Sequence, residues 1–371
     1  MEQLNVGIVG CGNISRIYLK NASRFDNFEI KAVADLVLHR AKKTALEFNI
    51  PKAYTTEELI ADPEIDVVIN LTIPAVHADV AIQALQAGKH VYGEKPLAVS
   101  REDGKKMINL AKEKGLYIGN SPDTFLGAGI QTCKKLIDDG QIGKPISATA
   151  FMMNPGHESW HPDPHFYYHK GGGPMFDMGP YYLTALIALM GPVQRVTGSA
   201  QKTYEERTIT SAEKYGEKIK VEVPTQINGV LDFENGAVAS IITSFDTWHH
   251  RLPHIEIYGT EGSIAVPDPN TFGGPVYLRK SEDKEWKEID FTHGFSTNSR
   301  GLGVAEMIDA ILSNRPSRAN GEIAYHVLDI MHGIHDASEQ GQHCYVNSSC
   351  IQPETLPVGI DEDSFSNKLK I

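Results

Sequence analysis

A short apolar run, residues 4–9, leads directly into Gly10-Cys11-Gly12-Asn13-Ile14-Ser15 and then into an amphipathic segment over residues 14–22. This order predicts a buried parallel strand, a tight glycine turn and a helix. Gly10 permits the turn, and Gly12 lets backbone amides approach a pyrophosphate at the helix N-terminus. Ser15 stands at the third glycine position of the dinucleotide fingerprint, where a small residue still allows close packing of helix on strand.

A second strand is expected over residues 28–34, ending at Asp35, about twenty residues after the glycines. An acid at this point accepts hydrogen bonds from the adenosine ribose hydroxyls and repels a 2′-phosphate. Leu36 follows the acid, and Arg40 lies on a predicted helix that should turn it away. The pattern therefore favours NAD over NADP. The alternative is that Asp35 is only a solvated acid at a strand end.

Strand and helix patterns continue to alternate as far as residue 122. Further strands are expected over residues 66–70, 90–92 and 116–119, and helices over residues 38–49, 57–60, 75–87 and 100–114. Because no hairpin signal interrupts this alternation, residues 1–122 are predicted to form an α/β Rossmann domain with a doubly wound parallel sheet. In such a sheet, ligands bind beyond the carboxyl ends of the strands.

Glu94-Lys95-Pro96 follows the strand at residues 90–92, so the Lys95 ammonium is expected at this binding edge. Pro96 restricts Lys95 to extended geometry and raises the chance of a cis peptide bond. Thr72-Ile73-Pro74 closes the preceding strand, and His77 follows in the first turn of the next helix. The alternative for Lys95 is a surface lysine at a strand-to-loop junction.

From Phe125 onward the hydrophobic periodicity changes to two. Strands are expected over residues 144–151, 194–202, 225–233, 237–245, 254–258, 263–266 and 275–280, and helices over residues 127–139, 299–312 and 323–335. Asn235-Gly236 is a hairpin turn signal. Residues 123–352 are therefore predicted to form an α+β domain for substrate binding, built on a large, mainly antiparallel sheet with one open face, followed by a tail over residues 353–371. The open face predicts a homo-oligomer.

Two segments of this second domain carry candidate substrate contacts. In the first, Gly171-Gly172-Gly173 allows close approach of the backbone, and a helix is expected to begin near Asp177, so that Asp177 and Tyr181 share one face. The second spans residues 157–169 and is rich in histidine and aromatic residues. Its candidate contacts are His157, Trp160, His161 and Tyr167.

Prolines in the second segment argue against a metal site there. Pro162 and Pro164 prevent the helix that would place its four histidines on one face. Rings and hydroxyl groups suit a sugar, which presents apolar C–H faces and hydroxyls. The alternative is a loop that contacts a second subunit.

Net charge and composition limit the partners and cellular location that the chain can have. The 371 residues carry a formal net charge of −12 without a basic run, which excludes nucleic acid and anionic membrane surfaces. Residues 1–9 lack the features of a signal peptide, and no stretch has the length of a membrane span. The four cysteines show no metal-binding or redox spacing, so we expect reduced thiols in the cytoplasm.

The order of these motifs is similar to that of the glucose-fructose oxidoreductase / inositol dehydrogenase family (Gfo/Idh/MocA), and Glu94-Lys95-Pro96 is the most specific part of the likeness. The resemblance implies that Lys95 touches both the nicotinamide ribose and the substrate hydroxyl, with Glu94 and His77 on the nicotinamide side. The implied cofactor-binding residues are Gly10, Gly12, Asn13, Ile14, Asp35, Thr72, Pro74, His77, Glu94 and Lys95.

One position departs from the family pattern. The family places an acid/base histidine four residues after the acid of its second domain, whereas this chain has Tyr181 there and Thr184 at the following acid position. This leaves Lys95, Tyr181 and Asp177 as the candidate catalytic set. Burial and the positive nicotinamide should lower the pKa of Lys95. Lys95 would then take the hydroxyl proton directly or through Tyr181, while Asp177 holds the substrate.

These residues predict NAD-dependent oxidation or reduction of a ring CH–OH on a sugar, glycoside or cyclitol, with oxidation at the sugar 3-position as the first hypothesis. Two alternatives remain. One is a glycosidase that uses NAD for transient oxidation and elimination. The other is a non-catalytic NAD-sensing protein, which has no need of Lys95 or Asp177.

Overall fold

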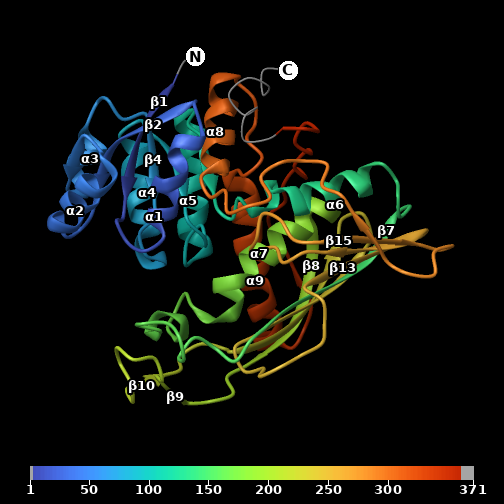
Figure 1. Cartoon of the computed structure of the whole chain (residues 1–371). Helices are drawn as coiled ribbons and strands as arrows, with labels where there is room; N and C mark the ends of the chain where they lie inside the picture. Colours follow the sequence, from blue (N-terminus) through green and yellow to red (C-terminus); the bar gives the residue numbers. More distant parts are fainter. Residues whose placement is uncertain (1–2, 361–371) are drawn as a thin grey trace. The chain divides into compact units, whose positions relative to one another are not determined.

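The computed structural model describes residues 3–360 and divides them into two compact units. The first unit takes residues 3–131, Thr292–Tyr325 and 353–360, and the second takes Thr132–Phe291 and His326–Gln352. Figure 1 shows the elements of each unit. The domain boundaries at residues 122 and 352 stay a prediction, and residues 361–371 of the expected tail lie outside the described part.

The first unit contains six parallel strands in the order β3-β2-β1-β4-β5-β6. This order confirms the predicted doubly wound sheet, because the chain moves outward from β1 first to one edge and then to the other. The strands are β1 (Leu4–Val9), β2 (Phe28–Ala34), β3 (Lys52–Tyr54), β4 (Val67–Asn70), β5 (His90–Gly93) and β6 (Ile118–Asn120).

Helices connect these strands, and local signals define several of their ends. Thr55 and Glu58 form a reciprocal capping box, Ser100 accepts a hydrogen bond from the Asp103 amide, and Gly115 ends its helix in the left-handed region. The helices are α1 (Ser15–Asn21), η1 (Ala22–Arg24), α2 (Leu38–Phe48), α3 (Thr56–Ala61), η2 (Pro74–Val76), α4 (His77–Gln86), α5 (Arg101–Lys114), η3 (Thr124–Leu126) and α8 (Leu302–Leu312).

The second unit is built on a nine-stranded sheet in the order β16-β15-β14-β13-β7-β12-β11-β8-β17. Only the β7–β12 pair is parallel, so the sheet is mainly antiparallel, as expected. Its strands are β7 (Pro145–Met153), β8 (Val193–Gln201), β11 (Gln226–Phe233), β12 (Val238–Ser244), β13 (Ile255–Gly259), β14 (Gly262–Val266), β15 (Val276–Lys280), β16 (Lys287–Ile289) and β17 (Cys344–Tyr345). A separate hairpin pairs β9 (Glu206–Thr208) with β10 (Lys218–Lys220).

Helices cover one face of this sheet. The remaining helices are α6 (Ala128–Asp138), η4 (His165–Tyr168), α7 (Gly173–Met190) and α9 (Gly321–Gln340). The almost fully buried α7 packs on β7, β11 and β12. Ile334 of α9 lies so close to β8 that a Cβ added at Gly198 would stand 2.6 Å from its side chain.

The helix carrying Asp177 begins at Gly173 rather than near Asp177. The reason is Pro174, which occupies the first turn, where its missing N–H costs nothing and its fixed φ suits the helix. Asp177 therefore lies in the second turn, although Asp177 and Tyr181 still share a helix face. Within residues 3–360, the helices lack the combination of length and apolar character that membrane crossing requires.

Candidate active site

The turn between β1 and α1 has the backbone that a dinucleotide needs. Gly10 has φ of +102°, and a Cβ there would lie 2.6 Å from the Leu71 carbonyl oxygen. Gly12 and Asn13 are exposed, and a Cβ added at Gly12 would meet nothing within 4 Å. The turn is thus closed on the protein side at Gly10 and open at Gly12, where a pyrophosphate would approach the backbone.

Asp35 lies at the end of β2 beside this turn. Its carboxylate accepts hydrogen bonds from the amides of Cys11 and Val37, both at 2.9 Å. Arg40 Nη1 also donates to both carboxylate oxygens, so a ribose hydroxyl would share these acceptors with Arg40. The open turn and this acid together fit the adenosine half of NAD.

The side chain of Arg40 does not point in the predicted direction. Its Nη1 lies 3.2 Å from Asp35 Oδ1, so it faces the acid instead of turning away. The cause is its place in the first turn of α2, since long helical side chains lean toward the N-terminus of their helix. Asp35 is 5 % exposed in this pair, whereas the Arg40 side chain is 55 % exposed.

Lys95 follows β5, and its peptide bond to Pro96 is cis. The preceding Glu94 holds this loop: one carboxylate oxygen accepts from the Tyr18 hydroxyl at 2.8 Å, and the other from the Lys95 amide at 3.2 Å. Asn120 Nδ2 donates to the carbonyls of Gly93 and Glu94. Burial, followed by the charge of Glu94, raises the pKa of Tyr18 well above its ordinary value, which keeps the phenol a hydrogen-bond donor.

His77 joins the two strand-end loops of the first unit. Its Nδ1 lies 2.7 Å from the Pro96 carbonyl oxygen and its Nε2 lies 3.0 Å from the Thr72 carbonyl oxygen. Burial lowers the pKa of His77, although the two carbonyls oppose that shift. Each ring nitrogen therefore faces a carbonyl oxygen of the protein, and the neutral imidazole donates to only one of them, while Thr72 and Pro74 remain half-buried on the loop. Cofactor contact by His77 stays a prediction.

The four predicted substrate residues of the 157–169 segment form one cluster in the second unit. Ring centroids lie 4.0 Å apart for His157 and Tyr167, 5.3 Å for His157 and Trp160, and 5.3 Å for His161 and Tyr167. His157 Nε2 lies 3.3 Å from Asp177 Oδ2 on α7. The structure thus brings His157, Trp160, His161, Tyr167 and Asp177 together, with Trp160 the most exposed of them at 61 %.

The start of α7 packs closely against the backbone of the 157–169 segment. A Cβ at Gly172 would lie 2.4 Å from the Phe166 carbonyl oxygen, so only glycine fits there. Gly173 has φ of +83°, which also favours glycine. The glycine run therefore lets η4 and α7 approach each other, as the sequence predicts.

Arg207 holds the residues that flank the cluster. No sequence motif indicates this role. Its guanidinium donates to Glu158 Oε1 at 2.8 Å, to the Pro155 carbonyl at 3.0 Å and to Asp246 Oδ1. It also lies between the rings of Tyr168 and Tyr204. Arg207 thereby fixes the residues on both sides of His157.

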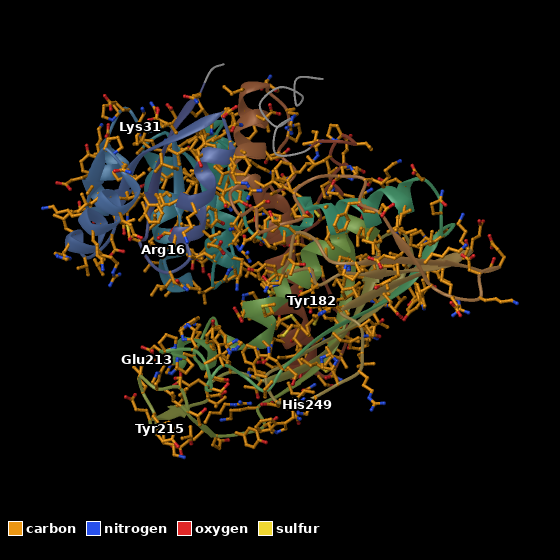
Figure 2. The ribbon with its side chains drawn as sticks, viewed as in Figure 1. Arg16, Lys31, Tyr182, Glu213, Tyr215 and His249 are labelled. Atoms are coloured by element: carbon orange, nitrogen blue, oxygen red, sulfur yellow. The ribbon has the colours of Figure 1, made fainter. Side chains whose placement is uncertain are left out.

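Two adjacent tyrosines on α7 have different surroundings. The Tyr182 hydroxyl lies 3.0 Å from His254 Nδ1, so Tyr182 (labelled in Figure 2) packs toward the sheet. Tyr181 is 8 % exposed and follows Asp177 by one helical turn. Lys95 belongs to the first unit, and Asp177 and Tyr181 belong to the second.

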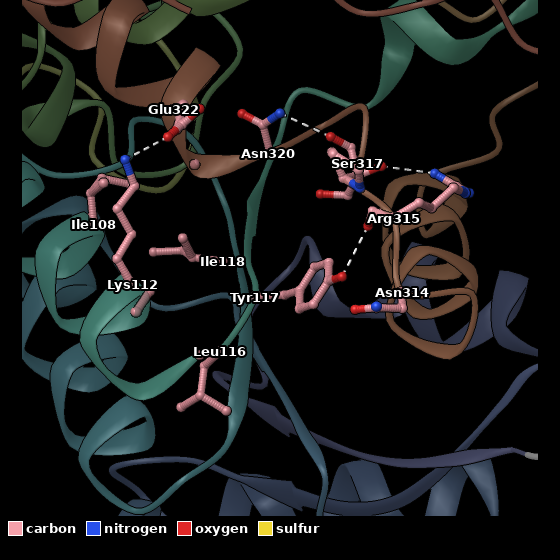
Figure 3. A pocket seen from close by; sticks show the side chains of 14 residues that line it. Ile108, Lys112, Leu116, Tyr117, Ile118, Asn314, Arg315, Ser317, Asn320 and Glu322 are labelled. Carbon is pink, nitrogen blue, oxygen red and sulfur yellow. Dashed lines mark hydrogen bonds and ion pairs between the residues drawn. The ribbon is translucent and has the colours of Figure 1, made fainter. Parts of the chain in front are cut away.

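A pocket of about 430 Å³ lies elsewhere in the first unit, between α5, β6 and the segment after α8 (Figure 3). Lys112 and Glu322 form an ion pair across its rim at 2.6 Å. It contains none of the predicted site residues. Among residues 3–360, the structure gathers no three His, Cys, Asp or Glu side chains in an arrangement that could hold a metal ion.

Comparison with family models identifies both halves of the chain. Residues 4–120 match the model of the oxidoreductase family with an NAD-binding Rossmann fold, and residues 130–265 match the model of the GFO/IDH/MocA C-terminal domain. The chain belongs to the Gfo/Idh/MocA family. It is thus an oxidoreductase-family protein whose cofactor is NAD, as the glycine turn and the Asp35 site already indicate.

Individual Gfo/Idh/MocA members are similar over most of their length. The 1,5-anhydro-D-fructose reductase of Ensifer adhaerens is 27% identical over 327 residues, which covers 85% of this chain and 90% of that protein. The myo-inositol 2-dehydrogenase of Thermotoga maritima is 25% identical over 262 residues, covering 70% and 74%. A solved levoglucosan dehydrogenase, in complex with NADH and L-sorbose, has the same fold with a TM-score of 0.81 at 22% identity, covering 94% and 100%.

Proposed function

We propose that this protein is an NAD-dependent dehydrogenase that acts on a ring CH–OH of a sugar, glycoside or cyclitol. The observation that carries the proposal is Lys95, which lies two residues after β5 at the carboxyl edge of an NAD-binding sheet. The two relatives described above support the substrate class, because one is named for an anhydro sugar and the other for an inositol.

In this proposal the chain's own residues handle the proton and orient the substrate. The glycine turn at Gly10 and Gly12 and the Asp35 carboxylate would hold NAD, which would supply the hydride acceptor for the carbinol carbon. Lys95, with Tyr181, acts as acid and base at the reacting hydroxyl. Asp177 orients the substrate from the same face of α7 as Tyr181.

The cluster of His157, Trp160, His161 and Tyr167 supports a substrate with apolar C–H faces and hydroxyls. The exposed Trp160 ring offers room for an aglycone, so we propose a glycoside oxidised at the 3-position as the first substrate to test. The carbon oxidised rests on analogy with sugar dehydrogenases.

We also propose preference for NAD over NADP, a homo-oligomer and a cytoplasmic location. The Asp35 carboxylate supports the cofactor preference because it would repel a 2′-phosphate. The half-buried Thr149, Ile242 and Tyr258 on the open side of the sheet support pairing through that face. The cysteine pattern of the chain supports the location.

Purified protein, NAD and a panel of myo-inositol, D-glucose, levoglucosan and aryl glucosides test the activity through the absorbance of NADH. Lys95→Ala should lower kcat/KM by about 10²–10⁴-fold, the range of general acid–base catalysis. NADH binding, followed by fluorescence, checks that this variant still holds the cofactor. Lys106→Ala, exposed on α5, is the matched control.

Two outcomes would contradict the proposal. Near-wild-type turnover by Lys95→Ala would remove Lys95 from the chemistry. Release of aglycone without net NADH would instead favour a glycosidase that oxidises its substrate transiently.

A further inference from the structure

A dehydrogenase of the proposed kind has to move a proton between the reacting hydroxyl and solvent. The ordinary pKa values of lysine and tyrosine side chains are near 10, so neither type readily releases a proton to water at neutral pH. Histidine is the side chain that does so most readily. The second unit places one histidine in contact with the α7 face that carries Asp177 and Tyr181.

His157 is held in one orientation. Its Nε2 faces Asp177 Oδ2 at 3.3 Å, and its backbone amide donates to the Tyr168 hydroxyl at 3.4 Å. The ring of Tyr167 at 4.0 Å and that of Phe245 at 4.6 Å pack against the imidazole. Only 8 % of the His157 side chain and 15 % of Asp177 are exposed, which strengthens a hydrogen bond to a carboxylate.

This contact leaves the other ring nitrogen available. A carboxylate only accepts hydrogen bonds, so Asp177 selects the tautomer in which Nε2 carries the proton and Nδ1 carries the lone pair. Within residues 3–360, Nδ1 has no hydrogen-bond partner, and it is not one of the fully buried polar atoms that lack one. The titratable groups that face the imidazole are Asp177, His161 and Tyr167.

We propose that the His157–Asp177 pair transfers the proton released at the reacting hydroxyl to solvent. During oxidation the substrate O–H bond breaks, and its proton passes from the base at that hydroxyl to Nδ1 of His157. The electron pair of the C–H bond leaves with the hydride to NAD, so the substrate gains its C=O bond. The imidazolium, stabilised by Asp177, then gives its proton to water or buffer, and reduction reverses each step. This inference rests on the proposed function and adds a residue to it.

His157→Gln is the first variant, because a glutamine amide can still donate to Asp177 but cannot exchange a proton. With a polyol that wild type oxidises, kcat should fall by about 10²-fold with little change in KM. The kcat of His157→Ala should fall by a similar factor. It should rise again as imidazole buffer is added, since free imidazole replaces the missing group. His165→Gln is the matched control, because His165 and Asp163 form a more exposed pair at 2.7 Å on the same segment.

Wild-type kcat and pH profile in His157→Gln would overturn the inference. So would loss of activity in His157→Ala that imidazole does not restore, because that result indicates a structural role. The ¹⁵N resonances of His157 in the resting protein give a test without turnover: the Nε2–H tautomer is expected, with a change in Asp177→Asn, and an Nδ1–H tautomer refutes the pair. Absence of NADH with every polyol would instead contradict the proposed function, and the tautomer would still decide this inference.

Discussion

Replacing Arg207 by methionine removes the cation that holds two buried carboxylates. The exposed fractions are 10 % for the Arg207 side chain, 11 % for Glu158 and 7 % for Asp246. Burial alone would lower the pKa of Arg207, but Tyr168 and the two acids raise it overall, so the guanidinium stays charged. Methionine keeps the apolar stem between the rings and deletes only the charge and its hydrogen bonds.

The expected destabilisation follows from the charges that remain. Removing one partner of a buried ion pair costs about 3–5 kcal/mol, because the other charge is left uncompensated. Here two carboxylates remain, although Thr203 and Thr225 each donate to Asp246 at 2.6 Å and compensate part of its charge. For a domain of 150–250 residues, this cost lowers Tm by roughly 6–20 °C.

Tryptophan fluorescence provides the assay. The three tryptophans of the chain, at positions 160, 248 and 286, all lie in the second unit, so their emission follows the unfolding of that unit. The control background is Glu158→Gln with Asp246→Asn, in which Arg207 is itself the uncompensated charge. Arg207→Met should then be nearly neutral or stabilising, because an apolar group replaces an unpaired buried cation.

The reasoning is refuted if Arg207→Met costs the same free energy in both backgrounds. Equal costs would mean that methionine disturbs packing between Tyr168 and Tyr204 and that the charges contribute little. A wild-type Tm for Arg207→Met alone would show that water already screens the carboxylates.

Two further predictions concern the first unit. Asp35→Ser should raise kcat/KM for NADP relative to NAD by on the order of 10–100-fold, because Arg40 loses its partner and becomes available to a 2′-phosphate; Asp35→Ser with Arg40→Ala should lose this gain, and an unchanged ratio would contradict the role of Asp35. Asp123 accepts hydrogen bonds from the Gly301 and Gly303 amides at the start of α8, and burial raises its pKa from 3.8 to about 6. The native state therefore binds the proton more tightly than the unfolded chain, and this stabilisation is complete below pH 3.8 and lost as the pH rises through 6. Relative to Asp123→Asn, wild type should lose about 2 kcal/mol of unfolding free energy between pH 4 and pH 7 in urea titrations followed by circular dichroism, whereas parallel pH curves would contradict the raised pKa of Asp123.

The cofactor half was predictable because its signals are local. Gly10 requires a positive φ, Asp35 ends a strand, and Lys95 follows another, and each of these properties can be read within a few residues of sequence. Arg40 was predicted wrongly because the direction of its side chain depends on where α2 begins. A start at Leu38 puts Arg40 in the first turn, from which a long side chain reaches back to Asp35.

The substrate half was harder to predict because its contacts are distant in sequence. His157 and Asp177 are twenty residues apart, and Arg207 joins Glu158 to Asp246, which lie on separate segments. Hydrophobic periodicity does not predict such pairings, because prolines interrupt the 157–169 segment and Arg207 belongs to a three-residue strand. Composition predicted that this segment would bind a hydroxyl-rich molecule, but only the structure reveals what orients each ring.

The neighbouring tyrosines of α7 show why residue type alone could not assign roles in this half. Successive residues of a helix point about 100° apart, so Tyr181 and Tyr182 cannot serve the same surface. Tyr182 is 2 % exposed and meets His254, which accounts for its hydroxyl within the fold. Tyr181 lies on the face of Asp177, whose carboxylate meets His157, so the proton-handling candidates of the second unit converge on one side of one helix.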